Sequence, residues 1–154
     1  MHADPEARRL TALAARAGVA DRFVMLGAVA REEMPALLRS ADAVVCPSVY
    51  EPFGIMPLEA MACGIPVIAS AVGGHLDSVA DRLTGRLFPP GDSQALARIA
   101  TELLASPATR TTYGAVGRHR VLTRYSWGQV AAATEEVYQE VAGMALDVSV
   151  KSGR

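Results

Sequence analysis

Two glutamates, Glu51 and Glu59, stand eight positions apart in the stretch VYEPFGIMPLEAMACGIPV. Gly54, between them, can adopt a positive φ or let a ligand approach the backbone closely. Carboxylates accept hydrogen bonds from hydroxyl groups, and the free N–H groups at a helix start bind phosphate. The combination favours a ligand with both phosphate and hydroxyl groups, such as a sugar nucleotide. Taken alone, Glu51 is more simply a solvated loop charge and Glu59 a helix-start residue.

The segments that would position these residues alternate between short apolar runs and helical patterns. Apolar runs predict strands at 23–26, 43–46 and 66–70, and a last short strand in GRLFPPGD. Helical patterns lie at 5–17, 31–41, 57–64, 75–81, 94–105, 107–123 and 127–143. Strands that alternate with helices indicate an α/β fold, a Rossmann-like parallel sheet with flanking helices.

Ligands of open parallel sheets bind beyond the carboxyl ends of the strands. The loop 47–54 follows the strand at 43–46, so Glu51 is expected at that edge of the sheet. Glu59 is expected in the first turn of a helix that starts near Met56 or Pro57. The helix dipole stabilises a carboxylate there by about 0.3–1 kcal/mol.

Composition and charge narrow the classes of protein. Of 154 residues, 51% are hydrophobic and 20% charged, so a folded chain is expected. We assign one domain to residues 1–146 and a frayed tail to 147–154. The net charge of -1 indicates no nucleic-acid partner, and no apolar run reaches the length of a transmembrane segment. The absence of a signal peptide and the two separated cysteines, Cys46 and Cys63, indicate a cytoplasmic protein with reduced thiols.

Other chemistries find no matching motif. The sequence has no P-loop, no G-x-S-x-G and no G-x-G-x-x-G after a strand, which leaves hydride transfer as a distant alternative. His2, His75 and His119 are too scattered to form a metal site with the cysteines. No Asp-x-Asp pair offers a metal-bound diphosphate clamp, so backbone amides and helix dipoles would have to hold a phosphate.

The run EPFGIMPLEAMACGIPVIASAVGG resembles the donor-site signature of the retaining GT-B glycosyltransferases called family 4 or group 1. The resemblance extends to VMLGAVAREEMPALLRSADAVVCPS upstream and to TGRLFPPGDSQALA downstream, and so covers about residues 5–143. It implies an incomplete C-terminal, donor-binding half of a GT-B fold. Two opening βα segments of that half are missing, together with an Arg and a Lys that neutralise the diphosphate.

The missing segments have a structural consequence. In a sheet of order 3-2-1-4-5-6, the absent strands would lie between the strand at 23–26 and the strand at 43–46. Their absence leaves strand edges unpaired. We therefore expect the isolated chain to self-associate, to need a missing N-terminal domain, or to rearrange its first 40 residues.

The resemblance also assigns roles to single residues. It makes Glu51 the catalytic position, which hydrogen-bonds and orients the donor sugar without being an assured nucleophile. It places Glu59 on the ribose hydroxyls and Gly74 beside the cleft. Leu76 and Asp77 replace the Pro and Glu of the common G-G-x-P-E, and no catalytic role is expected for the adjacent His75. Further donor-binding positions are the backbone of Phe53, Gly54, Ile55 and Met56 and, at the nucleobase, Met25 and Gly27.

The implied activity is hexosyl transfer from a nucleotide sugar, such as a UDP-, GDP- or ADP-sugar, with retention of configuration. It uses no metal and no cofactor, because the donor pyrophosphate helps to take the acceptor proton. The alternative is a catalytically inactive fragment that acts as a nucleotide-sugar-binding or oligomerisation module. We expect the isolated chain to be inactive or weakly active, in the cytoplasm or peripheral at the inner membrane face. The sequence does not name the base, the sugar or the acceptor.

Overall fold

The computed structural model describes residues 4–151, which form two compact units with a boundary between Met34 and Pro35. The first unit holds helix α1 (Pro5–Arg16) and the 3-10 helix η1 (Ala20–Arg22). The Asp4 carboxylate caps α1 by accepting from the N–H of Glu6 at 2.9 Å, and Pro5 occupies the first turn, so the predicted first helix is confirmed. A single domain over residues 1–146 stays a prediction.

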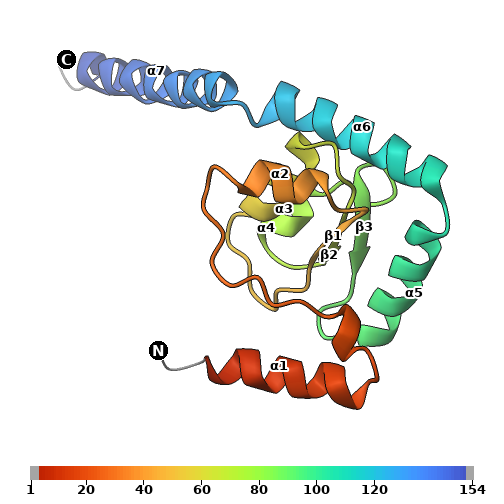
Figure 1. Ribbon diagram of the computed structural model, residues 1–154. Coiled ribbons are helices and arrows are strands. Elements are labelled where there is room, and N and C mark those ends of the chain that lie inside the picture. The colour runs from red at the N-terminus through yellow and green to blue at the C-terminus, as the bar shows by residue number, and fades with distance from the viewer. Residues whose placement is uncertain (1–3, 152–154) are drawn as a thin grey trace. The chain divides into compact units, whose positions relative to one another are not determined.

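Three short strands form a parallel sheet in the second unit, in the order β1-β2-β3 (Figure 1). Val44 of β1 pairs with Val67 of β2, which in turn pairs with Gly85 of β3. All four residues of β2 are buried, as a central strand of a sheet covered on both faces requires. The strands are β1 (Val44–Cys46), β2 (Val67–Ser70) and β3 (Gly85–Phe88). The predicted α/β fold is confirmed.

The predicted strand at 23–26 is wrong. The segment from Phe23 to Leu26 forms no strand, and among the described residues β1 has β2 as its one strand partner. An apolar run becomes a strand only when a neighbour supplies ladder hydrogen bonds, and no neighbour does so here. Val45 of β1 is accordingly 44% exposed. Self-association through such an open edge stays a prediction.

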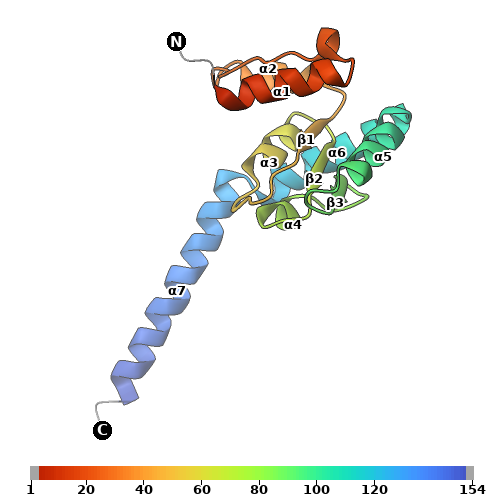
Figure 2. The same cartoon turned by 90° about the horizontal axis from the view of Figure 1, so that it is seen from below.

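Helices cover both faces of the sheet in Figure 1 and Figure 2, with α3 on one side and α5 on the other. On the α5 side, Ile68 and Phe88 of the sheet pack against Ile99 and Leu103. The Asp92 carboxylate caps α5 by accepting from Ala95 N–H at 2.8 Å. Helix α2 (Met34–Arg39) begins at the boundary between the units, and the other helices of this unit are α3 (Ile55–Ala62), α4 (Gly74–Ser78), α5 (Ser93–Leu104), α6 (Pro107–Arg124) and α7 (Trp127–Lys151).

Helices α6 and α3 approach each other closely because α6 carries two buried glycines. A Cβ at Gly117 would lie 2.9 Å from Cγ of Met61, and a Cβ at Gly114 would overlap the carbonyl oxygen of Gly64. This packing fixes α3, whose first turn borders the candidate site.

Helix α7 continues to Lys151, into the segment that the sequence analysis assigned to a frayed tail. Residues 152–154 of that tail lie outside the described part of the chain. Of the helices between Pro5 and Lys151, none combines the length and the apolar character that crossing a bilayer requires.

Candidate functional site

Two loops meet at the carboxyl edge of the sheet, one after β1 and one after β2. Gly74 N–H donates to the backbone carbonyl of Glu51 at 2.8 Å. A Cβ at Gly74 would lie 2.6 Å from the carbonyl oxygen of Phe53, and a Cβ at Gly73 would overlap the Glu51 carbonyl. Gly73 also has a φ of 40°, which side chains with a Cβ rarely adopt. The two glycines therefore let the loops touch through their backbones.

The Glu51 carboxylate closes its own loop. Its Oε1 accepts from the N–H of Gly54 at 3.0 Å and from the N–H of Phe53 at 3.3 Å. These two N–H groups, Gly54 first, hold the pKa of the Glu51 carboxyl below its usual value, and His75 acts in the same direction. The side chain is 25% exposed. Glu51 is therefore an ionised acceptor at the edge where a ligand of a parallel sheet binds.

The pH dependence of stability tests this anchoring. Because the folded pKa of Glu51 is lowered, its contribution is present above the unfolded pKa of about 4.3 and is lost as the pH falls through the folded value. We expect Glu51→Gln to be less stable than the wild type near neutral pH and the difference to shrink as the pH falls below about 4. Thermal melts across this range measure it. Glu136→Gln, at an exposed position of α7, is the control, and a Glu51→Gln deficit that is constant with pH would contradict the anchoring.

The first turn of α3 offers free backbone donors beside this carboxylate. Gly54, with a φ of 72°, is the N-cap residue, and the helix begins at Ile55. No hydrogen bond from the N–H groups of Ile55 and Met56 is found among the described residues, as expected for the first positions of a helix. The N–H groups of Phe53 and Gly54, predicted to meet the sugar and phosphate, are engaged by Glu51 instead.

Glu59 lies in the second turn of α3, so the prediction of a first-turn position is wrong. The helix starts before Met56 because Gly54 turns the chain in the left-handed conformation. The dipole effect falls off within the first turn, so the stabilisation expected for Glu59 does not apply. Its side chain is exposed and accepts no hydrogen bond among the described residues, which leaves it free to meet a ligand.

Two predicted nucleobase residues, Met25 and Gly27, belong to the first unit. Both lie in the non-helical segment that follows η1, and Gly27 has a φ of 71°. Their part in a nucleotide site stays a prediction. Gly74, in contrast, is in direct contact with the loop that carries Glu51.

The structure adds His75, to which the sequence analysis gave no catalytic role. This side chain is fully buried between the two loops, and its Nδ1 lies 2.9 Å from the carbonyl oxygen of Ser70. Its Nε2 has no hydrogen-bond partner among the described residues and lies 3.9 Å from Oε2 of Glu51. The one signal in the sequence was its position directly after Gly73 and Gly74.

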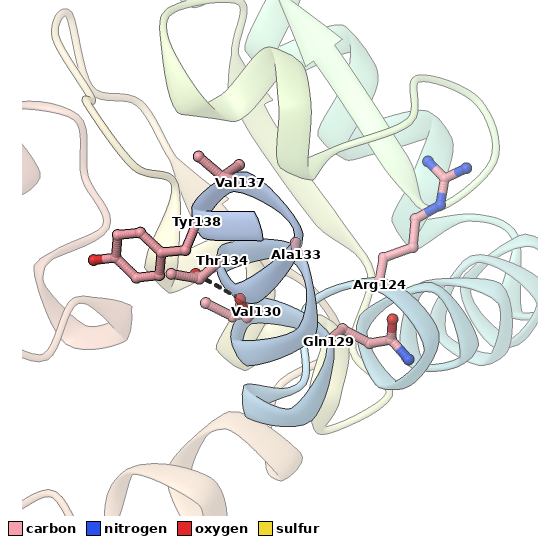
Figure 3. A pocket seen from close by; sticks show the side chains of 7 residues that line it. All are labelled: Arg124, Gln129, Val130, Ala133, Thr134, Val137 and Tyr138. Carbon is pink, nitrogen blue, oxygen red and sulfur yellow. Dashed lines mark hydrogen bonds between the residues drawn. The ribbon is translucent and has the colours of Figure 1, made fainter. Parts of the chain in front are cut away.

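A hollow lies along the end of α6 and the first turns of α7 (Figure 3). Arg124 is the one charged residue in its lining, and the Thr134 hydroxyl donates a hydrogen bond to the Val130 carbonyl at 2.8 Å. The lining side chains are Arg124, Gln129, Val130, Ala133, Thr134, Val137 and Tyr138. It shares no residue with the loops around Glu51, and its lining includes no carboxylate, thiol or imidazole.

A parallel α/β sheet with acceptors and a helix start at its carboxyl edge is typical of a Rossmann-like protein. The family model for "Glycosyl transferases group 1" matches residues 3–120, and the chain belongs to this family. Its fold matches part of the GT-B glycosyltransferases.

Several relatives are similar over most of this chain. An alpha-maltose-1-phosphate synthase of Mycobacterium tuberculosis is 43% identical over 115 residues, 71% of this chain and 30% of the relative. A D-inositol 3-phosphate glycosyltransferase of Salinispora arenicola is 40% identical over 131 residues, 85% of this chain and 29% of the relative. The chain thus spans about a third or less of these relatives.

Two solved structures show the same architecture. Sucrose-phosphate synthase from Thermosynechococcus elongatus superposes with a TM-score of 0.82 at 38% identity, over 92% of this chain and 37% of that protein. Anabaena HepE, solved in complex with UDP-glucose, superposes with a TM-score of 0.77 at 28% identity, over 89% of this chain and 36% of HepE.

Proposed function

We propose that this chain is the donor-binding part of a retaining, family 4 glycosyltransferase that transfers a hexose from a nucleotide sugar. The observation that carries the proposal is the ionised Glu51 carboxylate beside the open N–H groups of Ile55 and Met56. Hydroxyl groups need acceptors and phosphates need donors, and this edge of the sheet supplies both. Membership of the group 1 family and the UDP-glucose complex of HepE support it.

In the proposed complex, the N–H groups of Ile55 and Met56 donate to the distal phosphate. Glu59 accepts from the ribose hydroxyls. Glu51 accepts from the donor sugar and orients it, which is a positioning and electrostatic role rather than a nucleophilic one. The donor pyrophosphate takes the acceptor proton on the same face of the sugar, so the transfer needs no metal and no cofactor.

A second candidate function is a binding module without turnover, which pairs with another chain. The open edge of β1 and the half-exposed Val45 on that strand favour it. This chain spans about a third or less of the length of its relatives, which fits both a donor-binding part of an enzyme and a binding module without turnover. A cytoplasmic or peripheral inner-membrane location belongs to this proposal as well.

Calorimetric titration of the chain with UDP, GDP and ADP tests donor binding. We expect one nucleotide to bind and Glu59→Gln to weaken it roughly tenfold, since a hydrogen bond to a charged group contributes about 1.5–3 kcal/mol. Glu136→Gln, an exposed glutamate of α7, should leave the affinity unchanged. Absence of binding to all three nucleotides would contradict a donor role for this chain by itself.

A further inference from the structure

We propose that His75 is a positioning residue for Glu51, with a proton on both ring nitrogens and its Nε2–H paired with Oε2 of Glu51. The pair itself follows from the geometry of the two loops. Its importance for a ligand rests on the proposed function, in which Glu51 holds the donor sugar.

The first step assigns the proton on Nδ1. This atom lies 2.9 Å from the carbonyl oxygen of Ser70, which can only accept, so Nδ1 must donate. The Ser70 hydroxyl, 3.4 Å from the same nitrogen, points its hydrogen at the carbonyl of Ser48 and so offers Nδ1 a further acceptor. Nδ1 is therefore protonated whatever the charge of the ring.

The second step concerns Nε2, which can carry either a lone pair or a second proton. With a lone pair, a buried acceptor without a partner would face the carboxylate of Glu51 at 3.9 Å. Both groups would then be acceptors, and burial makes an unpaired polar atom costly. With a proton, Nε2 becomes a charge-assisted donor, and a closure of about 1 Å brings it to the normal distance of such bonds.

The charged groups around α4 agree with this assignment. Glu51 lies on the loop after β1, Asp77 on α4 itself and Arg120 on α6. Arg120 is turned to the carbonyls of Asp77 and Ser78, with contacts of 2.8 and 3.3 Å. Burial and the charge of Glu51 raise the pKa of the Cys46 thiol to about 11, so this neighbour is neutral. Within the described residues, Glu51 is thus the one charged side chain within ion-pair distance of the His75 ring, at 3.9 Å from Nε2.

The pair would hold the Glu51 carboxylate at both oxygens. Oε1 is fixed by the N–H groups of Phe53 and Gly54, and Oε2 by His75. Oε1 already accepts two hydrogen bonds, whereas Oε2 keeps a further lone pair, and the side chain is 25% exposed, so a ligand hydroxyl can still donate to Oε2. A carboxylate oriented before the ligand arrives loses less entropy on binding.

Nitrogen NMR of the full chain tests the protonation state without any ligand. With ¹⁵N-labelled histidine at about pH 7, we expect protonated shifts for both ring nitrogens of His75, identified by their absence in His75→Gln. In Glu51→Gln, the Nε2 proton should be lost while the Nδ1 proton remains. An unprotonated Nε2 in the wild type, or a spectrum that Glu51→Gln leaves unchanged, would overturn the pair.

Two substitutions then separate positioning from structural support. An Asn side chain can keep the donor to the Ser70 carbonyl, whereas a Gln side chain reaches the place of Nε2 and can donate to Glu51. We expect His75→Asn to lower the affinity for UDP-glucose roughly tenfold while the affinity for UDP stays the same. His75→Gln should restore part of the lost affinity for UDP-glucose. Equal weakening of UDP and UDP-glucose would overturn the positioning role. If the wild type binds neither compound, the proposed function fails while the NMR result still decides the pair.

Discussion

Gly114→Ala is expected to lower the free energy of unfolding by about 2–3 kcal/mol, the upper part of the usual range for overpacking. A Cβ at Gly114 of α6 would overlap the carbonyl oxygen of Gly64, which follows α3. The obstacle is backbone, so relief requires one helix to move away from the other. The better helix propensity of Ala, about 1 kcal/mol, offsets only part of this cost.

Gly128→Ala is the matched control, because Gly128 is also a helical glycine. The nearest atom to a Cβ there is the Ser126 hydroxyl oxygen at 3.9 Å, an ordinary contact. This variant should therefore be neutral or up to about 1 kcal/mol more stable. Urea denaturation followed by circular dichroism compares the two. Equal midpoints for Gly114→Ala and the wild type would mean that the close approach of α6 to α3 is absent in solution.

Most elements of the second unit could be predicted from the sequence because each has a local cause. Val44, Val67 and their neighbours form short apolar runs, and Asp92 and Ser106 cap the helices that follow them. The predicted start of α3, near Met56 or Pro57, is one or two residues late, because the helix begins at Ile55. The true N-cap is Gly54, which is left-handed and so closely packed that a Cβ would lie 2.6 Å from the Gly74 carbonyl oxygen and 2.8 Å from the Ser78 hydroxyl oxygen.

The segment 23–26 illustrates the opposite case. Its four apolar residues satisfy the pattern of a buried strand, but a strand also needs a partner, and partners are not visible in a local pattern. Among the described residues, the sheet has the order β1-β2-β3 and this segment has no strand partner, so its apolar pattern alone does not make it a strand.

The site was predictable in its residues but not in its internal contacts. Glu51, Glu59 and the glycines stand out by spacing and by motif. That Glu51 would bind the N–H groups of Phe53 and Gly54 depends on the conformation of its own loop, and that His75 would be buried against it depends on the meeting of two loops. Whether two residues 20 or more positions apart lie close together depends on the register of the sheet. The periodicity of apolar residues in the sequence does not predict that register.

Gly73→Ala is expected to separate these loops and to weaken nucleotide binding by tenfold or more. Gly73 has φ 40° and ψ −129°, a conformation that costs about 1–3 kcal/mol for a residue with a Cβ. The new methyl group would also overlap the Glu51 carbonyl, which accepts the hydrogen bond from Gly74. Moving that carbonyl moves the whole loop that carries the Glu51 carboxylate and the start of α3.

Gly91→Ala adds the first of these two effects, the backbone strain, without the second, the overlap with another loop. Gly91 also has a positive φ, 78°, but a Cβ there would meet no atom within 4 Å, so only the backbone strain is added. Both variants should lose stability, whereas only Gly73→Ala should release the Gly74 N–H, seen as faster amide hydrogen exchange, and lose nucleotide affinity by tenfold or more. If Gly74 exchange stays slow in Gly73→Ala, the loops are not held through Gly74 N–H and the Glu51 carbonyl. If exchange accelerates while affinity is kept, the two loops meet as described, but the ligand does not depend on their contact.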